Sequence, residues 1–102
     1  MNTSQSSEAS LETGVRPSPS VTLLVTTGCQ YCEDALAELS ARADLGELEL
    51  EVVFVESAYG RTLQTTHRPG MFPLVLLEGQ RFSVGRLPRR KLDRTLARRA
   101  AR

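Results

Sequence analysis

The chain has 102 residues, a formal net charge of +1 and a mean hydropathy of -0.23. This length fits one small domain with a modest hydrophobic core, so the chain can fold without a framework of disulfides. Two cysteines are too few for a disulfide-rich secreted scaffold, and no apolar run approaches the roughly 20 residues of a membrane helix. No basic segment followed by an apolar stretch opens the chain, so we expect a cytoplasmic protein that does not bind membranes.

Residues 1–20 are rich in Ser, Thr, Glu and Pro and contain few apolar side chains. Such a segment buries too little apolar surface to offset the entropy that it loses on ordering, so we predict a disordered N-terminal extension. The folded domain is then predicted to occupy residues 21–102.

Apolar patterns in this domain predict strands that alternate with helices. Short apolar or alternating segments predict four strands, at residues 21–26, 48–55, 73–77 and 80–84. Apolar residues at spacings of three and four predict three helices. The first follows the first strand and ends near residue 45, the second spans residues 57–66, and the third spans residues 88–102 and begins with Pro88. The order β-α-β-α-β-β-α indicates an α/β fold that opens with a right-handed unit of two parallel strands and closes with a hairpin and a helix.

Charge is divided unevenly along the chain. Residues 21–60 carry eight acidic residues and one basic residue, whereas residues 61–102 carry eleven basic residues and two acidic ones. A basic half can bind an anionic ligand or an acidic partner, but a solvated helix face has the same composition. Because no aromatic residues are interleaved with the arginines and the other half is acidic, we do not expect nucleic-acid binding.

The motif that carries chemistry is Gly28-Cys29-Gln30-Tyr31-Cys32, which holds both cysteines of the chain. Cys29 falls where the first strand gives way to a helix, so unpaired N–H groups and the helix dipole are expected to lower its thiol pKa below about 8.5. Cys32 lies on the same helical face and can close a disulfide with Cys29. The motif therefore predicts a redox pair, in which Cys29 attacks a substrate disulfide and Cys32 releases the product.

Two other interpretations of the cysteines stay open at this point. A structural zinc site needs four ligands, but the chain offers the two cysteines and His67 with no second CxxC, so we predict no metal site. The cysteines could also be two inert buried thiols, which a position in the middle of a helix or strand would favour.

The sequence resembles the glutaredoxin branch of the thioredoxin-like superfamily from Val21 to about Arg99. The resemblance rests on the order of the elements and on three landmarks, which are the CxxC motif, Met71-Phe72-Pro73 before the third strand, and Val84-Gly85 after the fourth. It implies a four-stranded mixed sheet flanked by helices and a cis Phe72–Pro73 peptide bond that faces the cysteines. It also implies a monomeric dithiol–disulfide oxidoreductase that takes part in electron transport.

The resemblance further implies a substrate site around the catalytic pair Cys29 and Cys32. The residue before the cis proline uses its backbone to pair with an extended substrate segment. The implied substrate-binding residues are Gln30, Tyr31, Phe72, Pro73, Gly85 and Arg86. Arg86 and Arg89 crowd the N-terminus of the last helix, where a bound anion would relieve the unfavourable placement of cations, whereas Arg90 and Lys91 are expected to reach solvent.

No bound cofactor is implied by the resemblance. The substrate is a protein disulfide or a low-molecular-weight thiol, and the reductant is a small thiol such as glutathione or mycothiol, or a flavoprotein reductase. The alternative function is that of a binding module with the same fold, which recognises an acidic partner through the basic C-terminal half and makes no use of the cysteines.

Overall fold

The computed structural model describes residues 18–101, and within them the elements follow the predicted order β-α-β-α-β-β-α. The strands are β1 (Ser20–Val25), β2 (Glu49–Phe54), β3 (Leu74–Leu77) and β4 (Gln80–Val84). The helices are α2 (Gln30–Asp44), α3 (Ala58–His67) and α4 (Arg89–Ala101). The predicted disordered extension falls largely on residues 1–17, which lie outside the described residues, and β1 already begins at Ser20.

The four strands form one mixed sheet in the order β2-β1-β3-β4. β1 is parallel to β2, and α2 supplies the crossover between them, as the strand–helix–strand pattern predicts. β3 is antiparallel to both β1 and β4. The predicted α/β architecture, with a four-stranded mixed sheet flanked by helices, is therefore confirmed.

The hairpin between β3 and β4 turns at Glu78 and Gly79, where it was predicted. Both residues have positive φ, of 52° and 80°. A two-residue turn with positive φ at both positions matches the right-handed twist of the strands that it joins. The hairpin places the end of β4 beside the start of β3.

Two prolines lie just outside the elements that they were predicted to open. β3 begins at Leu74 rather than Pro73, and α4 begins at Arg89 rather than Pro88. Proline has no N–H to donate, but both carbonyls are used: Pro73 O accepts from Gly85 N at 2.9 Å, and Pro88 O accepts from Leu92 N at 3.0 Å. Each proline therefore ends a loop instead of opening an element.

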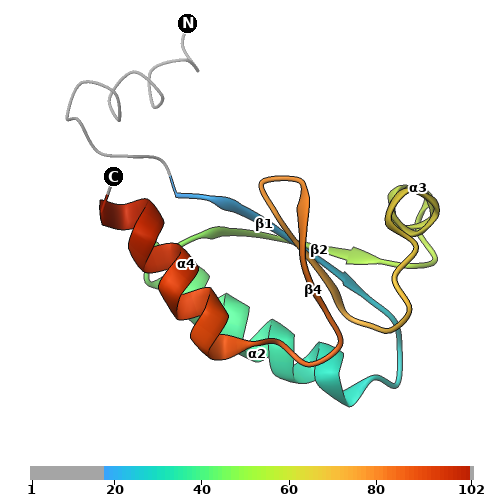
Figure 1. Ribbon diagram of the computed structural model, residues 1–102. Helices are drawn as coiled ribbons and strands as arrows, with labels where there is room; N and C mark the ends of the chain where they lie inside the picture. Colours follow the sequence, from blue (N-terminus) through green and yellow to red (C-terminus); the bar gives the residue numbers. More distant parts are fainter. Residues whose placement is uncertain (1–17, 102) are drawn as a thin grey trace, which may run out of the picture.

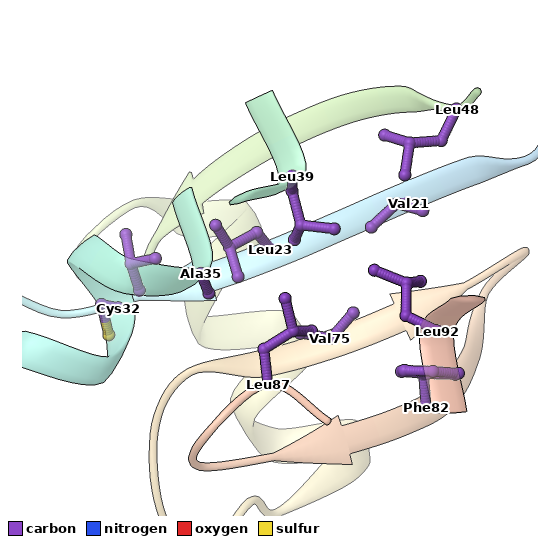
Figure 2. Packing of buried hydrophobic residues seen from close by; sticks show 11 residues of the cluster. Val21, Leu23, Cys32, Ala35, Leu39, Leu48, Val75, Phe82, Leu87 and Leu92 are labelled. Carbon is purple, nitrogen blue, oxygen red and sulfur yellow. The ribbon is translucent and has the colours of Figure 1, made fainter. Parts of the chain in front are cut away.

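The sheet is covered by helices on both faces. The larger core cluster joins the sheet to α2 and α4, and ten of its members are labelled in Figure 2: Val21, Leu23, Cys32, Ala35, Leu39, Leu48, Val75, Phe82, Leu87 and Leu92. A smaller cluster on the opposite face joins Leu63 of α3 to the sheet. Since β1 is central and covered on both faces, its apolar residues form a continuous run, with Leu23 and Leu24 both fully buried.

Ion pairs hold α2 against α4, which run side by side in Figure 1. Arg42 of α2 donates to Glu38 at 2.8 Å within its own helix and to Asp93 of α4 at 2.5 Å. Burial on its own lowers the pKa of Arg42, but the hydrogen bonds and charges of Asp93 and Glu38 outweigh it, so the pKa lies above its ordinary value. The network fixes the position of α4 relative to α2, and the CxxC motif lies at the start of α2.

No helix among residues 18–101 combines the length and the apolar character that crossing a bilayer requires.

Candidate redox site

Cys29 is the N-cap residue of α2, as its place after the first strand predicted. Gly28 before it has φ of 65°, which lets the chain turn from the sheet into the helix. Cys29 itself is extended, with φ −119° and ψ 108°, and its sulfur accepts from the backbone N–H of Cys32 at 3.1 Å. The sulfur therefore takes the place that a hydroxyl or carboxylate oxygen takes in other N-caps.

The two cysteines are joined as a disulfide, with their Cα atoms 5.2 Å apart. Their surroundings differ: Cys32 is 4% exposed and belongs to the core cluster between α2 and the sheet (Figure 2), whereas Cys29 is only partly buried. The pair sits at a helix start and Cys29 is not buried, so the structure does not favour the interpretation as two buried thiols. A partner molecule can reach Cys29 but not Cys32.

The Phe72–Pro73 peptide bond is cis, which confirms the expectation drawn from the resemblance. The carbonyl oxygen of Phe72 lies 3.9 Å from the sulfur of Cys29. A carbonyl oxygen disfavours negative charge on the sulfur, but the N–H of Cys32 is closer and favours it. The sulfur thus lies between a donor on its own helix and an acceptor on the opposing loop.

Gly85 follows the last residue of β4 and lies against the loop that contains Phe72 and Pro73. Its N–H donates to Pro73 O at 2.9 Å, and its φ of 78° is in the left-handed region. A Cβ at this position would lie 3.0 Å from Sδ of Met71, which is tighter than an ordinary contact. Met71, 50% exposed, therefore packs over a glycine, and sequence reasoning noted Met71 only as part of a landmark.

Tyr31 and Arg86 meet at the edge of the site, although they lie far apart in the sequence. The guanidinium carbon of Arg86 lies 5.5 Å from the centroid of the Tyr31 ring, which is within cation–π range. Tyr31 is 37% exposed, and Arg86 is exposed. Each residue was a candidate for substrate binding on its own, but no sequence signal indicated that they touch.

A basic hollow of about 700 Å³ adjoins this pair. It is lined by Asp34, Arg86, Leu87, Pro88, Arg89, Arg90, Lys91 and Arg94. Sequence reasoning had not included Asp34 and Arg94, although the spacing of Arg90 and Arg94 places them on one face of α4. Arg90 and Lys91 are exposed, as expected, but Lys91 Nζ also donates to Phe82 O at 2.7 Å and lies 4.4 Å from that ring's centroid.

No protein-family model matches this chain, and no curated protein does. Among solved structures, the chain is similar to one from Clostridium perfringens that is described as an uncharacterized thioredoxin-like protein and was determined in solution. The two are 20% identical with a TM-score of 0.62, and the match covers 86% of this chain and 75% of the other. The fold is thioredoxin-like. At this identity the likeness concerns the fold, and the chemistry of this chain is argued from its own residues.

In this thioredoxin-like fold, the CxxC pair lies between the end of β1 and the start of α2, and it faces the loop that contains the cis proline. A partly buried N-cap cysteine that closes a disulfide with a fully buried partner three residues later has the geometry of a thiol–disulfide redox centre. The predicted substrate-binding residues Phe72 and Gly85 lie around this centre, and Gln30 is exposed and donates to Asp34 at 3.1 Å.

His67, the third candidate zinc ligand, is the last residue of α3. Its carbonyl oxygen accepts a hydrogen bond from the guanidinium of Arg81. Within residues 18–101, no three His, Cys, Asp or Glu side chains are grouped so that they could share a metal ion.

Proposed function

We propose that this protein is a glutaredoxin-like dithiol–disulfide oxidoreductase that works as a monomer in the reducing cytoplasm. The observation that carries the proposal is the asymmetry of the CxxC pair. Cys29 is reachable at a helix N-cap and accepts an N–H bond at 3.1 Å, whereas Cys32 is 4% exposed. Cys29 is therefore the nucleophile and Cys32 the resolving thiol.

The proposed reaction has two exchange steps. The Cys29 thiolate attacks one sulfur of the substrate disulfide, a mixed disulfide forms, and the other substrate sulfur leaves as a thiolate that takes up a proton. Cys32 then loses its proton and attacks the Cys29 sulfur, so that the Cys29–Cys32 disulfide forms and the second substrate thiol leaves. Two electrons pass to the substrate, and the protein ends in the disulfide form.

The loop opposite Cys29 supplies the proposed contacts to substrate. Phe72 presents its carbonyl oxygen 3.9 Å from the Cys29 sulfur, so an extended substrate segment can pair with the Phe72 backbone while its sulfur approaches Cys29. Pro73 and Gly85 hold this loop in place through their 2.9 Å hydrogen bond. Gln30, Tyr31 and Arg86 form the rim on the other side.

The oxidised protein needs a reductant to complete a cycle. We propose no bound cofactor, because thiolate exchange at Cys29 requires only a second thiol. Two equivalents of a small thiol such as glutathione or mycothiol, or a flavoprotein reductase, would return the two electrons.

A trapping experiment tests the order of the two steps. The Cys32→Ser variant should attack a disulfide substrate and stop as a mixed disulfide on Cys29, which intact-protein mass spectrometry detects as one added substrate thiol. The matched Cys29→Ser variant should form no adduct at neutral pH, because Cys32 is buried. Equal adduct formation by both variants, or by neither, would contradict the assignment.

The second candidate function, a binding module for an acidic partner, is favoured by the basic hollow next to the site. It differs from the enzyme in one measurable respect. A binding module keeps its affinity for the partner in Cys29→Ser and shows no turnover in the wild type.

A further inference from the structure

We propose that the basic hollow selects the substrate, and that the substrate is a protein disulfide with an acidic segment beside it. The acidic segment would lie along α4 while the disulfide reaches Cys29. This inference rests on the proposed oxidoreductase function and names the class of substrate for the same site.

The charges of the hollow are unbalanced. Five basic residues and one carboxylate line it, and the carboxylate of Asp34 accepts a hydrogen bond from Gln30. Two of the cations have partners, because Arg89 lies 3.5 Å from Glu38 and Lys91 donates to Phe82 O. The other three are exposed, and within residues 18–101 no carboxylate lies within 4.0 Å of Arg86, Arg90 or Arg94.

These three arginines follow one another along the chain from the rim of the redox site into α4. Arg86 rests on the ring of Tyr31, which stands between the two cysteines in the sequence. Arg90 and Arg94 follow on α4 and are separated by about 6 Å along the helix axis. The positive charge therefore starts at the rim of the redox site and continues for a further turn of α4.

The extent of this charge favours a polypeptide over a small thiol. A small anionic thiol joined to Cys29 can reach the charge nearest the disulfide, but Arg94 would stay unmatched. Carboxylates spaced along a peptide can pair with Arg86, Arg90 and Arg94 together, and guanidinium groups bind carboxylates in a bidentate manner. The apolar residues Leu87 and Pro88 in the same hollow offer contacts to the peptide backbone and to the CH₂ groups of its side chains.

The same surface fits a nucleic acid less well. Binding of single strands uses exposed aromatic rings on which bases stack, but the hollow is lined by no aromatic residue and the neighbouring Tyr31 ring is occupied by Arg86. The acidic residues of the first half of the chain also repel a long polyanion.

A pair of matched peptides tests the inference with the reduced full-length protein. Each peptide contains one internal disulfide, and one carries Asp and Glu beside it where the other carries Asn and Gln. Rates are measured in a single turnover, so the two electrons come from the protein itself. We expect the acidic peptide to be reduced about tenfold faster at ~0.01 M salt, and the preference to disappear at ~1 M, where the Debye length is about 3 Å.

Two variants with the same net charge locate the effect. Arg90→Gln/Arg94→Gln removes two charges from the hollow and should reduce the ratio of the two rates to about one at low salt. Arg61→Gln/Arg68→Gln removes two charges from exposed positions in α3 and at its C-cap, on the face of the sheet opposite α4, and should keep the preference.

The outcomes separate the inference from the function on which it rests. Reduction of both peptides at equal rates overturns the inference and leaves the oxidoreductase in place, whereas reduction of neither peptide overturns both. If both variants lose the preference for the acidic peptide equally, the preference comes from the net charge of the protein, and the assignment of the acidic segment to the basic hollow is overturned. A single-stranded oligonucleotide that displaces a labelled acidic peptide from the hollow at lower concentration than the unlabelled peptide would assign the hollow to nucleic acid and overturn the proposal.

Discussion

The backbone N–H of Cys32 points at the sulfur of Cys29 across 3.1 Å. One turn of α2 therefore supplies the proposed resolving thiol, an N–H donor that favours a thiolate at Cys29 and the positive end of the helix dipole. The Phe72 carbonyl, at 3.9 Å, opposes this effect from a greater distance. The balance of these two contacts favours negative charge on Cys29.

The first prediction concerns the pH dependence of the reduced protein. We expect the Cys29 thiol to ionise with a pKa below the ordinary value of about 8.5, because the N-cap donor and helix dipole favour its thiolate. Thiolate absorbance followed from acid to alkaline pH measures this, with Cys29→Ser as the control that removes the early transition. A first transition at or above the ordinary value, still present in Cys29→Ser, would contradict the prediction.

The second prediction concerns Gly60, whose backbone packs against the end of β2. A Cβ at this position would lie 2.0 Å from the carbonyl oxygen of Phe54, a backbone atom that cannot move aside alone. We expect Gly60→Ala to destabilise the protein by about 3 kcal/mol, because α3 must move away from the sheet. Urea unfolding of the oxidised protein measures the loss.

Gly70→Ala is the matched control for this change. Nothing lies within 4 Å of a Cβ at Gly70, and its φ is not in the left-handed region. Gly70→Ala should change the free energy of unfolding by less than about 1 kcal/mol. We expect the change to be a stabilisation, since alanine restricts the unfolded chain. Equal losses in the two variants would show that the contact with Phe54 does not set the cost.

The third prediction concerns Arg42, which joins α2 to α4 through Asp93. We expect Arg42→Gln to lower the free energy of unfolding by about 1 kcal/mol, since its carboxylate partners are partly exposed. The exposed Arg98 has no ion-pair partner among the described residues, so Arg98→Gln should stay within about 0.5 kcal/mol.

The pH dependence of this difference follows from the raised pKa of Arg42. A cationic group whose folded-state pKa is raised contributes stability that is complete below its unfolded-state pKa and is lost only as pH rises through the folded-state value. For Arg42 that loss lies in strong alkali, above the ordinary pKa of an arginine, because the Arg42 pKa is raised. The difference between wild type and Arg42→Gln should thus stay constant from neutral to moderately alkaline pH, and a marked fall there would contradict the assignment.

The fourth prediction concerns Gly85 and Met71. Gly85 and Gly79 have nearly the same φ, 78° and 80°, but only Gly85 has a neighbour within 4 Å of its missing Cβ. Alanine at either position should cost about 1 kcal/mol for the left-handed backbone, and Gly85→Ala should cost more because Met71 must move. Thermal or urea unfolding of both variants gives the excess. In Gly85→Ala/Met71→Ala that excess should disappear, and if it persists the sulfur contact is not its cause.

Much of the site could be predicted because its parts are local in sequence. The strand before Cys29, the helix after it and the spacing of Cys32 are all contained in one short stretch, so periodicity and turn signals place the pair at a helix N-terminus. The cis Phe72–Pro73 bond was predicted from the family resemblance, because the residue pattern alone also permits a trans proline at the start of a strand.

The sequence by itself determined the order of the elements and the position of the CxxC pair at a helix N-terminus, because hydrophobic period and helix capping depend on neighbours within a few residues. Only the tertiary structure decided which distant side chains meet: Arg86 with Tyr31, Asp34 with the basic hollow, and Lys91 with Phe82. These contacts depend on how α4 packs against α2 and β4. That packing is set by the buried surfaces and ion pairs of the whole domain, and no local pattern in the chain encodes it.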